Sequence, residues 1–451
     1  MRNKEDRTEV FESMPIGRAV LKLSVPTVLS CLVMVIYNLA DTYFVGQLGD
    51  PVQNAAVTLV APVILAFNAV NNLFGTGSSS LMSRALGLKD YDLVKRSSAF
   101  GIYMALFAGI FFSAGVLIFQ KPLLGLLGAV DENMEATQEY LKWTVIFGAI
   151  PAILNVVVSF IVRAEGSALH AGIGTMSGCL LNIILDPIFI LEDGLNMGAS
   201  GAGLATFISN VVACLYFAVF LIVRKSRTYV CINPRYFRPD RKLVKDVFIV
   251  GVPAAVQNLL NVTGMAVLNR HMSGYGTEPV AAIGIAHKLA MVMMYVSMGI
   301  SQGVMPLVGY NYSQKNTKRM RDAVRLTFFW SAAIMAAAAV LLILFPDFVV
   351  GLFMEEPLTR ELGAAFLVGQ ALAQPFLAMD FLGVGVFQAC GLGGRTLVFA
   401  ILRKLVLEIP AIIILDRLVP MYGIPYAALV AEVILAAVSA VMLVKILRVK
   451  E

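Results

Sequence analysis

The sequence contains little charge for its length. Only 14% of its 451 residues are Asp, Glu, Lys or Arg, whereas soluble globular proteins average about 25%. The hydrophobic residues, 59% of the chain, form recurring runs of about 20 residues, each long enough to cross ~30 Å of hydrocarbon. These proportions exclude an ordinary soluble domain and predict an all-α polytopic membrane protein.

Several motifs are also missing. The 5 cysteines are scattered without CxxC spacing, so neither a disulfide framework nor a resident metal site is expected. No Gly-x-Ser-x-Gly or His-Glu-x-x-His motif appears in the apolar runs, which argues against an intramembrane enzyme. The first 17 residues lack the apolar core of a signal peptide and are interpreted as a cytosolic tail. We therefore expect no enzymatic activity and no cofactor apart from a coupling ion.

The apolar runs predict twelve transmembrane helices. Their approximate ranges are 18–46, 52–83, 97–119, 141–162, 171–191, 202–223, 247–270, 280–308, 323–345, 363–390, 398–416 and 424–444. Most Lys and Arg residues then fall in the tails and in the loops on the N-terminal side, as the positive-inside rule requires. The net charge of +6 therefore reflects topology and not affinity for nucleic acid. We expect a multi-pass protein of the cell (inner or plasma) membrane with both termini cytoplasmic.

The two halves of the chain resemble each other weakly. Val25-Pro26 corresponds to Val252-Pro253 and Gly77 corresponds to Gly303, with further small-residue matches in the same order. This predicts a cytoplasmic tail (1–17), an N-lobe of six helices (18–223), a basic cytoplasmic linker (224–246), a C-lobe of six helices (247–445) and a C-terminal tail (446–451). Because each half has an even number of spans, the repeats are parallel, and rocking of one lobe against the other is the expected motion.

Two aspartates interrupt the apolar runs of the first half. A carboxylate near the middle of a membrane helix costs ~2.5–3.5 kcal/mol on insertion scales and usually marks an ion or substrate path. Asp41 lies four residues after Tyr37, and Asp186 lies four residues after Asn182, so each pair shares a helix face. Thr206 and Asn155 add oxygen donors from other spans. Hard oxygen donors suit Na⁺, and two neighbouring acids can share a proton.

The polar residues of the first half also have a simpler interpretation. Asn155, Asn182 and Thr206 could each merely hydrogen-bond a neighbouring helix. That reading is weaker for Asp41 and Asp186, because an ionised acid in a membrane needs a strong partner. We therefore predict a site for H⁺ or Na⁺, with Na⁺ held by Asp41, Asn182, Asp186 and Thr206.

The second half carries different ionisable groups in its predicted spans. Lys288 is a candidate partner for Glu408 or Asp380, and Glu432 is given a structural role. Methionines at 291, 293, 294 and 298 form an adaptable apolar surface of the kind that promiscuous binders use. The predicted substrate contacts are Asp380, His287, Met291, Met294 and Tyr295.

Certain stretches carry a resemblance to a known family. They are Pro26 through Asp41-Thr42-Tyr43-Phe44-Val45-Gly46, the segment Leu181-Asn182-Ile183-Ile184-Leu185-Asp186-Pro187, and the repeated Gly-Ala pattern. Over roughly residues 14–445 the chain resembles the multidrug and toxic compound extrusion (MATE) transporters. The pattern is closest to the branch with N-lobe aspartates, which includes DNA-damage-inducible and archaeal members.

The resemblance implies twelve helices in two pseudo-symmetric six-helix lobes of a V-shaped fold. It also implies export of small-molecule drugs and toxic organic cations across the lipid bilayer, by a monomer, against inward flow of Na⁺ or H⁺. Matched position by position, the family's N-lobe cation site gives Tyr37, Asp41, Asn155, Asn182, Asp186 and Thr206. Another branch has a seventh-span glutamate, which is Asn261 here, and a tenth-span acid, which is Asp380 here.

The favoured function is a cation-coupled multidrug efflux antiporter working by alternating access. The alternative is a lipid-linked oligosaccharide flippase of the same broader superfamily, whose cavity should be strongly cationic. Our count places only Arg270 and Lys288 within or at the edge of spans, against acids at Asp41, Asp186, Asp380 and Glu408. That balance disfavours the flippase.

Overall fold

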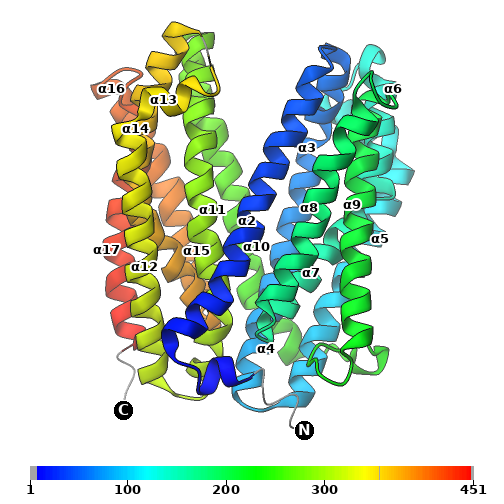
Figure 1. The fold of residues 1–451 in the computed structure, drawn as a ribbon, viewed down its shortest axis with the longest axis vertical. Coiled ribbons are helices and arrows are strands. Elements are labelled where there is room, and N and C mark those ends of the chain that lie inside the picture. Colours follow the sequence, from blue (N-terminus) through cyan, green and yellow to red (C-terminus); the bar gives the residue numbers. More distant parts are fainter. Residues whose placement is uncertain (1–7, 355, 448–451) are drawn as a thin grey trace. The chain divides into compact units, whose positions relative to one another are not determined.

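The computed structural model describes residues 8–354 and 356–447, and within these ranges every regular element is a helix (Figure 1). The elements of the first half are α2 (Ile16–Gln47), α3 (Pro51–Asn71), η1 (Asn72–Thr76), α4 (Gly77–Gly87), α5 (Tyr91–Leu127), α6 (Asp131–Leu141), η2 (Lys142–Ile146), α7 (Ala149–Ala164), α8 (Ala168–Ile190) and α9 (Gly198–Val223). The prediction of an all-α protein is confirmed.

The second half follows the turn η3 (Pro234–Tyr236). Its elements are α10 (Arg241–Met272), η4 (Ser273–Tyr275), α11 (Thr277–Ser313), α12 (Thr317–Leu344), α13 (Pro346–Gly351), α14 (Pro357–Ala389), α15 (Gly393–Ile401), η5 (Leu402–Glu408), α16 (Ile409–Leu418), η6 (Ile424–Tyr426) and α17 (Ala427–Leu447). Within this half, α14 packs against α11, α12 and α17 (Figure 1).

The chain divides into two compact units. The first unit contains Leu32–Ala255, and the second contains Phe11–Cys31 together with the chain from Val256 onward. Two long helices are therefore shared: α2 begins in the second unit and ends in the first, and α10 does the reverse. These are the two helices that the repeat pattern pairs through Pro26 and Pro253, so the sharing obeys the internal symmetry. The lobe boundaries given by sequence stay a prediction.

Ten helices among the described residues are long and apolar enough to span a membrane. The bent pair Asp131–Ile146 and Ala149–Ala164, with 41° between its parts, makes an eleventh. The remaining predicted span, 398–416, is built from three short pieces, α15, η5 and α16. This span contains the charged residues Arg403, Lys404 and Glu408, all in the π-helical piece η5, so it is less apolar than we predicted.

Small residues allow equivalent close contacts inside each unit. In the first unit, a Cβ on Gly251 of α10 would lie 2.0 Å from the carbonyl oxygen of Leu73. In the second unit, the equivalent residue on α2 is Ser24, whose hydroxyl donates to the carbonyl of Ile300 at 3.5 Å. Both pairs are related by the same shift of 227 residues (24 to 251, and 73 to 300), so the repeat seen in the sequence is also a repeat of packing.

Candidate functional site

The polar residues predicted in the first half all lie in the first unit. Tyr37 and Asp41 come from the later part of α2, Asn155 from α7, and Thr206 from α9. Asn182 and Asp186 lie one turn apart on α8 and are 1% and 0% exposed. Pro187 follows Asp186 inside α8 and lacks the N–H that would bond the carbonyl of Ile183. The cluster is thus assembled from four helices, with a free backbone acceptor beside it.

Asn182 links α8 to α9. With its amide oriented to satisfy both neighbours, Nδ2 donates to Oδ2 of Asp186 at 3.0 Å, and the amide oxygen accepts from the backbone N of Thr206 at 3.1 Å. The same amide lies 3.4 Å from the Thr206 hydroxyl. The amide therefore holds the Asp186 carboxylate in place through a neutral donor and leaves its charge uncompensated.

Asp41 and Asp186, which we call the acid pair, interact electrostatically with each other. The Oδ1 atom of Asp41 is buried and accepts no hydrogen bond. Among the ion pairs of the described residues, none joins either acid to Lys, Arg or His. Tyr37 lies close to Asp41 and to the side chain of Thr206. Within the described part of the chain, the pair has neighbours that can orient an ion but no basic residue that would replace one.

Two members of this cluster were missed by the sequence analysis. Tyr140 of α6 interacts electrostatically with both Asp41 and Asp186. Asn210 of α9 accepts from Asn155 at 3.3 Å and donates to the backbone carbonyl of Thr206 at 2.9 Å. Asn210 lies one helical turn after Thr206, so the spacing of four residues was a usable signal. Nothing in the sequence indicated Tyr140, which reaches the acids only through tertiary packing.

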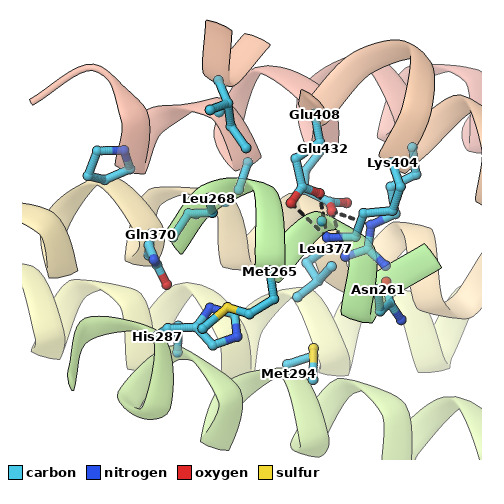
Figure 2. A pocket seen from close by; sticks show the side chains of 18 of the residues that line it. Asn261, Met265, Leu268, His287, Met294, Gln370, Leu377, Lys404, Glu408 and Glu432 are labelled. Carbon is cyan, nitrogen blue, oxygen red and sulfur yellow. Dashed lines mark hydrogen bonds and ion pairs between the residues drawn. The ribbon is translucent and has the colours of Figure 1, made fainter. Parts of the chain in front are cut away.

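A cavity of about 90 Å³ lies in the second unit. Methionines 265, 291 and 294, His287, Asn261 and the amides Gln370 and Gln374 contribute to its wall, together with Arg403, Lys404, Glu408 and Glu432. In Figure 2, Lys404, Glu408 and Glu432 gather at one end, whereas Met265, His287 and Met294 lie together away from them. The cavity therefore has a charged end and an apolar, sulfur-lined side.

The charged end is organised by two basic residues of η5. Arg403 contacts Glu432 at 2.7 Å and Asp380 at 3.5 Å, and Lys404 contacts Glu408 at 2.6 Å. Our count of basic residues in the spans was therefore wrong, because it omitted Arg403 and Lys404. The suggested partner for Glu408 or Asp380 was wrong as well: Lys288 is exposed. Asp380 pairs with Arg403 of the next span, and Glu408 pairs with Lys404 one turn earlier in its own span.

The predicted substrate contacts divide into two groups. His287, Met291 and Met294 line the cavity. Asp380 is 1% exposed and is paired with Arg403 behind the wall, while Tyr295 is half-buried and lies close to Cys31. Glu408 and Glu432, which we did not include among the substrate contacts, both line the cavity. The structure thus gathers three of the five predicted contacts at one cavity.

Comparison with known proteins gives a consistent result. The MatE family model matches this chain twice, at residues 26–188 and 253–414. The multidrug export protein MepA of Staphylococcus aureus strain MRSA252 is 32% identical over 448 residues, which cover 99% of this chain and 97% of that protein. The double match also supports the internal repeat.

Solved structures agree with the family match. One, described as the outward-facing conformation of a multidrug resistance MATE family transporter of the MOP superfamily, matches with a TM-score of 0.92 at 27% identity, over 98% of this chain and 99% of that one. Another is a MOP superfamily transporter from Pyrococcus furiosus, for which reverse polarity of the binding pocket suggests a different function; it matches with a TM-score of 0.88 at 26% identity, over 97% and 98% of the two chains.

The fold and these matches define a class, a multi-pass membrane transporter with two related halves. The chain belongs to the MATE family. It is a transport protein and not an enzyme, as the sequence analysis predicted.

Proposed function

We propose that this chain is a cation-coupled multidrug efflux antiporter, with the acid pair of the first unit as its coupling site. Support comes from the relative named as a multidrug export protein, from the buried side chain of Asp186 and from the buried, unpartnered Oδ1 atom of the half-buried Asp41. The exported compounds are small amphipathic molecules, many of them organic cations. The transporter works as a monomer in the cell membrane with both termini in the cytoplasm.

The coupling ion is H⁺ or Na⁺, and both fit the chemistry of the cluster. A proton would neutralise one acid of the pair and relieve the repulsion between Asp41 and Asp186. Na⁺ would be held by carboxylate, amide and hydroxyl oxygens, which are the hard ligands it prefers. In either case one bound ion compensates one of the two charges and so lowers the cost of keeping them within the membrane.

An ion drives transport only through its different affinity for two states. Loading of the acid pair stabilises one conformation, and release of the ion to the cytoplasm allows return. Pro26 lies inside α2, where the missing N–H weakens the helix, so bending of α2 near Pro26 is the proposed link between ion loading and drug release. Tyr37 and Asn182 act as orienting groups for the acids.

The observation that carries this proposal is the absence, among the described residues, of a basic partner for the acid pair. Purified protein in vesicles should expel a cationic dye under an inward H⁺ gradient, under an inward Na⁺ gradient, or under either one. The two gradients are imposed in separate experiments. No efflux under either gradient would contradict the proposal. Response to one gradient only would identify the ion.

The flippase alternative is not favoured by the charges of the second unit. A strongly cationic cavity would suit a pyrophosphate group, and Arg403 and Lys404 do line the cavity. Each of them is already paired with a carboxylate. The wall therefore offers no free positive charge for an anionic head group.

A further inference from the structure

The charge cluster at the cavity of the second unit, which includes Asp380 behind the wall, has more negative than positive groups. Its charge cluster consists of three acids, Asp380, Glu408 and Glu432, and two bases, Arg403 and Lys404. With every group ionised the cluster has a net charge of −1. A buried charge without compensation is strongly unfavourable, so the cluster is completed by one positive charge from outside.

The unpartnered atoms on the cavity wall indicate where that charge binds. Oε2 of Glu432 and Oε1 of Gln374 are buried and make no hydrogen bond. Glu432 is 2% and Gln374 5% exposed, and both line the cavity. The other oxygen of Glu432 accepts from Arg403 at 2.7 Å, and the Gln374 amide nitrogen donates within its own helix at 3.3 Å. Nη1 of Arg403, which also makes no hydrogen bond, lies 3.5 Å from Oδ2 of Asp380. The free oxygens of Glu432 and Gln374 are both acceptors, so they call for a donor.

The rest of the cavity wall suits the apolar part of a ligand that carries such a donor group. Met265, Met291 and Met294 are flexible, polarisable side chains that adapt to apolar groups of different shape. At about 90 Å³ the cavity is smaller than the ~300–1,000 Å³ typical of drug-sized ligands. It therefore holds a head group, while the remainder of the molecule extends past the methionines.

We propose that this cavity binds the protonated amine head group of amphipathic organic cations, through N–H donation to Glu432 and Gln374. The inference rests on the proposed function only in treating organic cations as ligands of this chain. It goes further in predicting that cations bearing N–H groups bind more tightly than quaternary cations of equal charge. A quaternary nitrogen brings the charge but cannot satisfy the two acceptors.

The test uses a matched pair of probes on the purified full-length protein, without any gradient. The first probe is dansylcadaverine, a fluorescent molecule that ends in a primary ammonium group. The second probe is the same molecule with that terminal nitrogen trimethylated. Dansylcadaverine should bind at least ~10-fold more tightly than its quaternary analogue, since a hydrogen bond to a charged group is worth about 1.5–3 kcal/mol. Equal affinities would overturn the inference.

Two variants locate the site. Gln374→Leu removes one acceptor without changing any charge. It should lower the affinity for dansylcadaverine about 10-fold and the affinity for the quaternary analogue less than about 2-fold. Glu432→Gln should lower the affinity for both probes, because it also removes the negative charge. The control is Thr327→Val, since Thr327 is buried in the same unit but bonds only its own helix at 2.7 Å and does not line the cavity.

The outcomes separate this inference from the coupling proposal. If Glu432→Gln does not fold, Gln374→Leu alone decides, and unchanged binding of dansylcadaverine to that variant refutes the site. Because binding is measured without ion gradients, failure of the acid pair to couple transport would leave these results unaffected.

Discussion

The two units have related folds but treat buried acids in opposite ways. In the first unit, Asp41 and Asp186 have no basic partner among the described residues, and a neutral amide orients one of them. In the second unit, Arg403 and Lys404 contact Asp380, Glu432 and Glu408 directly. Two built-in cations thus balance two of the three acids in the second unit, whereas no described basic residue balances either acid of the first unit in this way. This difference is why we propose ion coupling for the first unit and ligand contact for the second.

The largest expected effect comes from removing charge in the first unit. Asp41→Asn and Asp186→Asn should each lower gradient-driven dye efflux on the order of 100-fold, because the ion then has no differential affinity for the two states. Neither variant breaks an ion pair, so both should fold. The measurement is initial efflux rate at matched protein content in vesicles. Retention of full efflux by both variants would remove the distinction between the units.

The second effect should appear as lost stability in the second unit. Arg403→Met leaves Glu432 and Asp380 buried without their cation, and breaking a buried pair in this way costs about 3–5 kcal/mol. Thermal unfolding in detergent should show a large decrease in the midpoint. The double variant Arg403→Met, Glu432→Met should recover part of the lost midpoint, because it also removes Glu432, the acid that lies closest to Arg403. If Arg403→Met is as stable as the native protein, the pairing has no structural role.

A smaller loss of stability is expected from substitutions at the two equivalent packing positions, Gly251 in the first unit and Ser24 in the second. Gly251→Ala places a methyl group against the Leu73 carbonyl and should destabilise the first unit by about 1–3 kcal/mol through overpacking. Ser24→Ala at the equivalent position of the second unit should cost less, about 1 kcal/mol, since it removes one weak hydrogen bond. Gly115→Ala is the control, because nothing lies within 4 Å of its added Cβ.

The smallest effect concerns an acid outside the membrane that does have a partner. The backbone N–H of Leu243 and then the side chain of Arg96, 2.5 Å away, hold the pKa of Asp240 below its usual 3.8. Its ionised form is thus favoured by folding, so the contribution is present above the usual pKa and is lost as the pH falls through the lower folded value. Because Asp240 is exposed, the effect is small.

This pH dependence can be measured directly. The unfolding midpoint of the native protein should fall slightly more than that of Asp240→Asn when the pH is lowered from 6 to 3. Identical curves would show that Arg96 and Asp240 do not interact in solution.

Much of this arrangement was predictable because it is local. Hydropathy indicates membrane helices, and spacing of four residues places Tyr37 with Asp41 and Asn182 with Asp186 on shared faces. Arg403 and Lys404 were overlooked because we treated 398–416 as one apolar span, whereas the structure pairs both bases with acids there. Tyr140 could not be found, since only the folding of α6 against the other helices brings it to the acids.

The central claim is most directly tested by thermodynamic linkage at equilibrium. An ion and a drug that are exchanged must alter each other's affinity by the same factor. The affinity of the native protein for a cationic dye should change with pH or Na⁺ concentration, and Asp380→Asn should retain that dependence. In Asp186→Asn the dependence should vanish while the dye still binds. Loss of the dependence in Asp380→Asn, with its full retention in Asp186→Asn, would place the coupling ion in the other unit and contradict the account.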